Sequence, residues 1–169
     1  MPTRSRLMTV SRLAQRAVLA VTLLVAGCAG HGDPLSPGEI RALAIARDRW
    51  HHSAARNAYR YEVLQSCFCP PEVSQWNTIT VIDGVVVGVV DQGGTTVPAE
   101  RWSSHLTVDG LFAALDREPD DFLDDIIVRF DPTDGYPLEI NFIASPQVMD
   151  GGGAIFARNL RPVVRPGGG

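Results

Sequence analysis

The sequence predicts an α+β domain built on a single antiparallel β-sheet of five to six strands, with two amphipathic helices on one face. Several short segments alternate apolar and polar residues, as half-buried strands do. Two other segments carry apolar residues at three- and four-residue spacing, as helices that cover a core do. Most connections between strands are short, which makes neighbouring strands antiparallel. The expected order is helix, three strands, helix and two strands, with a sixth, edge strand if the C-terminal segment also pairs.

The first 27 residues have the organisation of a lipoprotein signal peptide. Four arginines up to Arg16 form a positive region, and Ala17–Ala26 is an apolar run too short to span a bilayer. Small residues then precede Cys28, the pattern at which a lipid is attached. We expect residues 1–27 to be removed and Cys28 to be lipidated. The alternative is an ordinary signal peptide that is cleaved near an unmodified Cys28.

Export would leave an acidic chain that only its lipid attaches to the membrane. Four of the 15 basic residues, all of them arginine, precede Cys28, so the remaining 142 residues carry eleven arginines against 19 acidic residues, a net charge of −8. Such a surface repels nucleic acid and anionic headgroups, so we expect no nucleic-acid partner. The expected location is the bacterial cell envelope, with the protein lipid-anchored and facing the periplasm or the cell exterior.

Residues 28–35 are expected to form a tether, and residues 36–164 a single domain that opens with a helix. Ser36 can cap this helix, Pro37 suits its first turn, and Glu39 stands at the capping-box position. An apolar stripe follows, which predicts a helix to about residue 56. The stripe consists of Ile40, Leu43, Ala46, Trp50 and Ala54.

Three strands are expected after the helix. Tyr59 and Tyr61 share one face of the first strand, which ends at Cys67–Pro71 because two prolines cannot continue a ladder. The dipeptide Asp83-Gly84 is a strong hairpin signal between the second and third strands. The strands are placed at residues 58–66, 77–82 and 85–90, and a long loop at residues 91–105.

A second helix is expected to start at the cap Thr107 and to end by Pro119. Two alternating strands follow, joined by a turn-rich loop in which Gly135 supplies an unusual backbone angle. Residues 154–164 are interpreted as an edge strand limited by its prolines, and residues 165–169 as a flexible tail.

The repeating apolar faces also predict the core. Alternate residues of a strand point to the same side of the sheet, so every second residue is expected inside. The predicted core comprises Tyr59, Tyr61, Val63, Ile79, Val81, Val87, Leu111, Leu115, Val128, Phe130, Ile140 and Phe142.

Cys67 and Cys69 are the cysteines that remain once Cys28 carries the lipid. An even pair in an oxidising compartment predicts a disulfide. Fully extended backbone separates such Cα atoms by about 6.6 Å, near the upper limit for a disulfide, so a modest bend before Pro70 is enough. Two alternatives stay open: a redox-active pair, and a soft-metal site or free thiols.

Other polar residues give weaker signals. Asp48 and His52 have the four-residue spacing of a surface pair, and His51 points in a different direction from His52, so one helix cannot present both to a metal. The acidic cluster from Asp116 to Asp125 lacks the spacing of a calcium loop. No catalytic motif is recognisable, so we predict no enzymatic activity, catalytic residue, metal site or cofactor.

Several short motifs occur in a characteristic order along the chain. They are Trp50 before Tyr59-x-Tyr61, Cys67-x-Cys69-Pro70, the hairpin at Asp83-Gly84, and Gly135-Tyr136-Pro137 after Asp131. Together with the lipoprotein signal, they resemble an uncharacterised family of small bacterial lipoproteins, classed as a domain of unknown function. The resemblance covers roughly residues 40–160 and implies a location and a domain extent, but no activity.

Two functions are compatible with these residues. The favoured one is a non-catalytic binding or structural module of the envelope, whose sheet face or long loop binds an envelope protein or a small ligand. The alternative is a thiol-redox or soft-metal-handling lipoprotein that acts through Cys67 and Cys69. The exposure and redox state of this pair distinguish the two, since a buried bond that resists reduction favours the first.

Overall fold

The computed structural model describes residues 35–164 except 117–121, 147 and 149–150. The described residues belong to one compact unit, Asp33–Gly169. The predicted signal peptide, the lipidation residue Cys28, most of the tether and the tail at residues 165–169 lie outside the described residues. No helix within the described ranges is long and apolar enough to cross a membrane.

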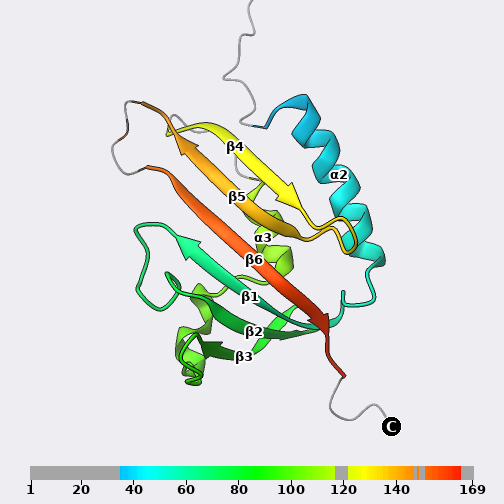
Figure 1. Ribbon diagram of the computed structural model, residues 1–169, viewed down its shortest axis with the longest axis vertical. Helices are drawn as coiled ribbons and strands as arrows, with labels where there is room; N and C mark the ends of the chain where they lie inside the picture. The colour runs from blue at the N-terminus through cyan, green and yellow to red at the C-terminus, as the bar shows by residue number, and fades with distance from the viewer. Residues whose placement is uncertain (1–34, 117–121, 147, 149–150, 165–169) are drawn as a thin grey trace, which may run out of the picture. The chain divides into compact units, whose positions relative to one another are not determined.

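The described residues form one six-stranded antiparallel sheet with helices on one face, which confirms the predicted α+β class. The elements are α2 (Pro37–His52), β1 (Ala58–Ser66), β2 (Asn77–Ile82), β3 (Val85–Asp91), the 3-10 helix η1 (Ala99–Ser104), α3 (Val108–Ala114), β4 (Leu123–Phe130), β5 (Pro137–Ala144) and β6 (Gly153–Pro162). Figure 1 shows α3 behind the sheet and α2 alongside β4. The end of α2 lies on the same face as α3, because Trp50 and Val108 both contact Tyr59. The strand order is β3-β2-β1-β6-β5-β4.

The last strand is not at an edge, so that prediction is wrong. β6 lies in the middle of the sheet and pairs with both β1 and β5. Strands β1 to β3 form one meander, and β4 and β5 form a hairpin. Without β6, β1 and β5 would each have an unpaired edge. β6 joins the two groups into one sheet. Pro162 is tolerated because it is the last residue of the strand, where the ladder ends.

Helix α2 starts as predicted and ends earlier than predicted. The Ser36 hydroxyl accepts from the Glu39 amide at 3.3 Å, and the Glu39 carboxylate accepts from the Ser36 amide at 3.0 Å, which completes the capping box. Ser53 is extended and caps the other end. The predicted stripe is wrong at both ends, because Ile40 is 45% exposed and Ala54 lies beyond the helix. The buried stripe is therefore Leu43, Ala46 and Trp50.

The predicted core residues are buried, or packed against the buried core, with one exception. Val87 is 45% exposed, because a β-bulge changes the register between Thr80 and Val81. The bulge pairs Val81 with Val86, so Val86 packs against the core in place of Val87. A single inserted residue thus reverses the faces of half a strand.

The segment predicted as a long loop before α3 contains a β-bridge and a 3-10 helix. Thr96 bridges to Val90, and residues 99–104 form η1. The indole of Trp102 donates to the carbonyl of Val97 at 2.9 Å, which holds η1 against this bridge. The loop therefore covers part of the free edge of β3.

Three aromatic side chains join both helices to the central strand β1. The rings of Trp50 and Tyr59 meet edge to face at 5.2 Å, and the Trp50 indole donates to a carboxylate oxygen of Asp109 at 3.0 Å. The Tyr59 hydroxyl accepts from the Val108 amide at 2.8 Å, at the first turn of α3. The Tyr61 hydroxyl donates to a backbone carbonyl just before that helix.

The loop between β4 and β5 touches α2 through a glycine. Gly135 has φ of 79°, and a Cβ atom at this position would overlap the carbonyl oxygen of Ala46 and lie 2.8 Å from the Cβ of Arg49. Asp134 accepts from the Ser53 hydroxyl at 2.6 Å, which ties the same loop to the end of α2. Only glycine permits both the backbone angle and the close approach.

The tyrosines give a prediction for alkaline pH. The chain has three tyrosines, and burial raises the pKa of Tyr59, Tyr61 and Tyr136 above the ordinary value. The stability that these neutral phenols contribute is fully present below the unfolded pKa of about 10, and is lost as the pH rises through the raised folded values. We expect phenolate absorbance at 295 nm to appear only together with loss of the circular dichroism signal.

The urea-unfolded chain is the control, and its tyrosines should ionise near pH 10. Reversible ionisation of any tyrosine near that pH in the folded protein would show that the side chain is accessible and that the described core is incorrect at that position.

The loop glycine gives a second prediction. Gly135→Ala should destabilise the protein more than Gly94→Ala, which replaces a glycine of similar φ, 83°, with no atom within 4 Å of the added Cβ. Both variants carry the cost of the left-handed backbone, so their difference reports the contact with α2. We expect the difference in unfolding free energy, measured in urea, to be about 1–3 kcal/mol. Equal destabilisation would mean that the loop does not pack on α2.

Candidate functional site

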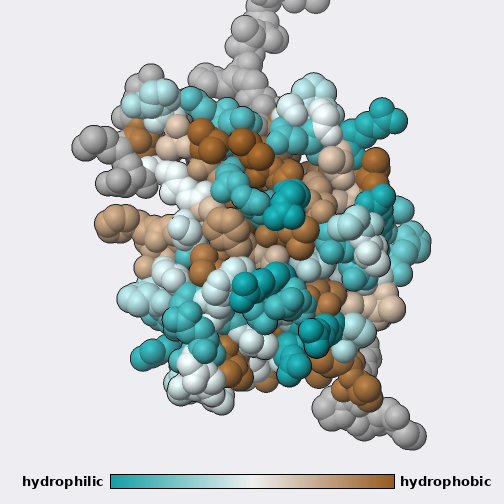
Figure 2. All heavy atoms as spheres, viewed as in Figure 1, coloured by the Kyte–Doolittle hydropathy of each residue, from teal (hydrophilic) through white to brown (hydrophobic). Residues whose placement is uncertain are grey.

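The face of the sheet opposite the helices remains uncovered by the described elements. Figure 2 views this face and shows hydrophilic and hydrophobic residues side by side across it. Alternate residues of each strand point here, in register with their neighbours. From β3 to β4 these residues include Val90, Thr78, Thr80, Arg60, Glu62, Leu64, Phe156, Arg158, Glu139, Asn141, Ile127 and Arg129.

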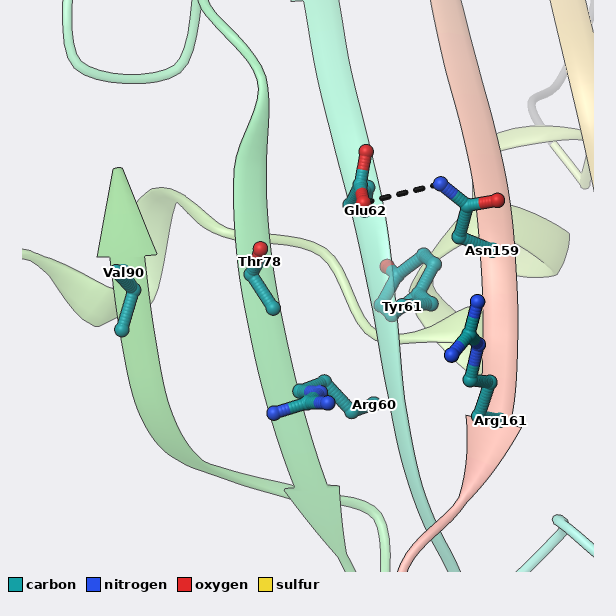
Figure 3. A pocket seen from close by; sticks show the side chains of 7 residues that line it. All are labelled: Arg60, Tyr61, Glu62, Thr78, Val90, Asn159 and Arg161. Atoms are coloured by element: carbon teal, nitrogen blue, oxygen red, sulfur yellow. Dashed lines mark hydrogen bonds between the residues drawn. The ribbon is translucent and has the colours of Figure 1, made fainter. Parts of the chain in front are cut away.

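A hollow of about 340 Å³ lies on this uncovered face, over the first half of the sheet. Four strands contribute to it, and Figure 3 shows how the side chains lie around it. Its lining residues are Arg60, Tyr61 and Glu62 of β1, Thr78 of β2, Val90 of β3, and Asn159 and Arg161 of β6.

Strand register brings these residues together. Arg60 lies opposite Arg161, and Glu62 lies opposite Arg158. A bulge in β6 between these two pairs adds a residue, and Asn159 adopts a φ of 56° there. Asparagine tolerates this left-handed conformation better than most residues. The bulge lets β6 present both Arg158 and Asn159 to the same carboxylate.

Glu62 accepts hydrogen bonds from those two neighbours and also attracts Arg161, without a hydrogen bond to it. Its carboxylate accepts from the Asn159 amide at 3.0 Å and from the Arg158 guanidinium at 2.7 Å. The pKa of Glu62 is lowered, first by the Asn159 hydrogen bond and then by Arg158. The Arg158 guanidinium in turn stacks over the Trp76 ring at 3.8 Å, so its position is also set.

Arg60 and Arg161 differ from the other arginines of the sheet. Neither guanidinium forms a hydrogen bond or ion pair with another residue of the described part of the chain. By contrast, Arg129 pairs with Glu139 at 3.2 Å, and Arg158 pairs with Glu62. Two like charges directly opposite on adjacent strands repel each other. The hollow therefore has two arginines without hydrogen bonds on its walls, of which Arg161 is partly offset by the charge of Glu62, in a chain that is acidic overall.

The predicted cysteine site lies elsewhere, at the corner after β1. The side chains of Cys67 and Cys69 are in close contact, and their Cα atoms lie 5.1 Å apart, a separation that a disulfide permits. Phe68, between them, is 98% exposed. The amide of Gln65 donates to the carbonyl of Val73 at 3.0 Å, which closes the corner behind the pair. The corner is not part of the hollow.

The weaker candidates are not brought together. The His52 ring lies 3.6 Å from the Asp48 carboxylate with both side chains exposed, as a surface pair does. Asp116 pairs with Arg47, and the middle of the acidic cluster lies outside the described residues. Within the described ranges no group of three or more potential metal ligands occurs among His, Cys, Asp and Glu side chains.

A second hollow, of about 470 Å³, lies where the β2–β3 turn approaches the ends of the helices. His51, Ser53 and Asp83 are among its lining residues. Its Arg56 and Asp109 pair with each other at 2.9 Å. Because these charges neutralise each other, this hollow offers a ligand less than the arginine-lined one does.

The sequence alone does not indicate the hollow on the sheet. The alternation around Tyr59 and Tyr61 places Arg60 on the outward face of β1, but it does not show that β1 pairs with β6. A signal is present, since Arg158, Asn159 and Arg161 are polar residues in a segment that otherwise reads as a strand. Their partners become identifiable only with the strand order.

The comparisons with known proteins identify a family but no activity. Residues 42–162 match the family model described as "Family of unknown function (DUF6174)". No curated protein and no solved structure matches the chain. The matched range includes all six strands and most of α2.

Proposed function

The chain belongs to this family of unknown function, and we propose that it is a non-catalytic binding module of the bacterial cell envelope, held at the membrane by a lipid on Cys28. The uncovered face of the sheet is the binding surface. The family supplies no activity, so the proposal is argued from the residues of this chain.

One observation carries the proposal: the two helices cover a single face, and the other face has a hollow whose two arginines lack partners among the described residues. An ordinary solvated sheet face places opposite charges across from each other, as Arg129 and Glu139 do here. Like charges opposite each other cost stability, and a bound ligand offsets that cost.

The signal pattern before Cys28 supports the membrane attachment. Helix α2 begins at Pro37, nine residues after Cys28. Nine extended residues span at most about 30 Å, so a lipid on Cys28 would keep the domain close to the membrane surface. An envelope ligand would then meet the sheet face near the bilayer.

The thiol-redox function remains a second candidate, because one observation favours it. Phe68 is 98% exposed and Cys67 is also exposed, so a reductant can reach the pair. A buried bond would have argued against redox chemistry, and the corner is not buried.

The lipid anchor can be tested by substitution. Cys28→Ser should leave the protein unprocessed or release it from the membrane fraction, because the acyl chains would be its attachment. Fractionation and labelling with a radioactive fatty acid measure both effects. If the variant stays processed, membrane-bound and labelled like the wild type, the lipoprotein proposal is wrong.

The binding face can be tested by photocrosslinking in cells. A photoreactive residue replaces Thr80, on the uncovered face outside the hollow, or Ala44, which is exposed on α2. We expect discrete adducts from position 80 and none from position 44, as judged by mass spectrometry of the purified protein. The same adducts from both positions, or none from position 80, would contradict a macromolecular partner at this face.

The state of the cysteine pair can be measured by alkylation. Cys67 and Cys69 should take up no reagent in the native protein unless a reductant is added, since export leaves them in an oxidising compartment. The double Cys→Ser variant should fold with a loss of about 1–2 kcal/mol, because the closed loop is small. Uptake of two reagents without reduction would overturn the disulfide and favour free thiols or a metal site.

A further inference from the structure

We propose that the hollow on the sheet binds a small organic anion, whose phosphate or carboxylate group lies between Arg60 and Arg161. This inference rests on the proposed binding function of the uncovered face and adds the chemical class of its ligand. The lining residues, their charges and the register of the two central strands support it.

The opposition of the two arginines is the first step. Arg60 and Arg161 are register partners on the adjacent strands β1 and β6. The acid closest to them in register, Glu62, accepts from Asn159 and Arg158 and contributes no hydrogen bond to either arginine. An anion between the guanidiniums would relieve their repulsion and receive charge-assisted hydrogen bonds, which are the stronger kind.

The shape of the hollow sets the size of the ligand. Figure 3 shows Arg60 extending over β2 below Thr78, whereas Arg161 lies over β6 below Asn159, so the two guanidiniums flank the hollow on different sides. A volume of about 340 Å³ is at the small end of ligand sites. Val90 adds an apolar wall and Thr78 a hydroxyl. The hollow therefore suits a small anion, with room for an apolar part beside Val90, and is too small for a large polymer.

The far wall of the hollow is held by contacts within the chain. The stack of Arg158 on Trp76 and the two hydrogen bonds to Glu62 set the positions of these side chains around the bulge at Asn159. Arg158 is thereby committed to Glu62, so it positions the wall and is not a ligand-binding cation. Only the two unpaired arginines need to be ordered on binding, which lowers the entropic cost.

Because the chain is acidic overall, anion binding at this site can be distinguished from nonspecific electrostatic attraction. A chain with 19 acidic and 15 basic residues repels anions on average. Affinity for an anion at this position would therefore report the local geometry of the arginines. The same anion should not collect at isolated surface arginines such as Arg41.

The test uses the full chain with Cys28→Ser if that variant is soluble, and otherwise the lipidated chain in detergent. Inorganic phosphate, phenyl phosphate, succinate and benzoate are titrated at constant ionic strength, with choline as the cationic control. We expect the amide resonances of Arg60, Thr78 and Arg161 to shift with the anions and not with choline. The phosphates and the carboxylates form separate arms, which identify the preferred head group.

Two variants decide the role of the arginines. Arg60→Gln with Arg161→Gln should weaken anion binding about tenfold or more, since it removes both charged donors. Arg41→Gln is the matched control and should bind like the wild type. In buffer without the anions, the double variant should unfold at nearly the wild-type urea concentration, because the lost repulsion between the arginines offsets the lost attraction of Arg161 to Glu62. A clear loss of stability would instead make the arginines structural and overturn the inference.

Failure of this inference and failure of the proposed function give different results. Unchanged resonances with every anion, or equal binding by the double variant, would overturn the anion site even if position 80 still forms crosslinks. The uncovered face would then still be a binding surface, but for a ligand of another chemical class. If anion binding depends on the arginines but position 80 forms no adducts, the anion site is supported. The macromolecular partner is then ruled out.

Discussion

The junction of Trp50, Tyr59 and Asp109 is the contact on which the arrangement of this domain depends. It joins α2, the central strand β1 and the start of α3 through a ring contact and two buried or half-buried hydrogen bonds. Because both helices are fixed to the same side of β1, neither covers the other side. The uncovered face is thus a consequence of where one tyrosine and one tryptophan point, and the hollow lies on the reverse side of the same strand.

The second constraint is the central position of β6. This strand closes the gap between the β1–β3 meander and the β4–β5 hairpin, and it places Arg161 opposite Arg60. The bulge at Asn159 then turns two polar side chains toward Glu62. Fold and candidate site therefore share their cause, since the pairing that completes the sheet also assembles the hollow.

Local features of the fold are predictable from the sequence, whereas pairings between distant segments are not. Ser36 and Glu39 indicate the start of α2, Asp83-Gly84 indicates the hairpin, and the alternation around Tyr59 and Tyr61 locates β1, because each signal lies within a few residues. The edge assignment of β6 is wrong because prolines near a strand end do not report which strands lie beside it. The burial predicted for Val87 is wrong because a bulge leaves no mark in a valine-rich segment.

The candidate site is harder to predict than the fold for the same reason. Arg60 and Arg161 are about a hundred residues apart in the sequence, and neither belongs to a motif with known chemistry. The feature that the sequence does indicate, the cysteine corner, is exposed and separate from the hollow. A site that strand pairing assembles can be predicted only when the strand register is known, and only the structure supplies that register.

The most direct test of the arginine-lined hollow is a crystal structure of the full chain grown with phenyl phosphate. We predict the strand order with β6 between β1 and β5, an uncovered sheet face, and phosphate density contacting both Arg60 and Arg161. A helix or a second segment of the chain packed over this face would contradict the proposed binding surface. So would an empty hollow with the phosphate bound at another position.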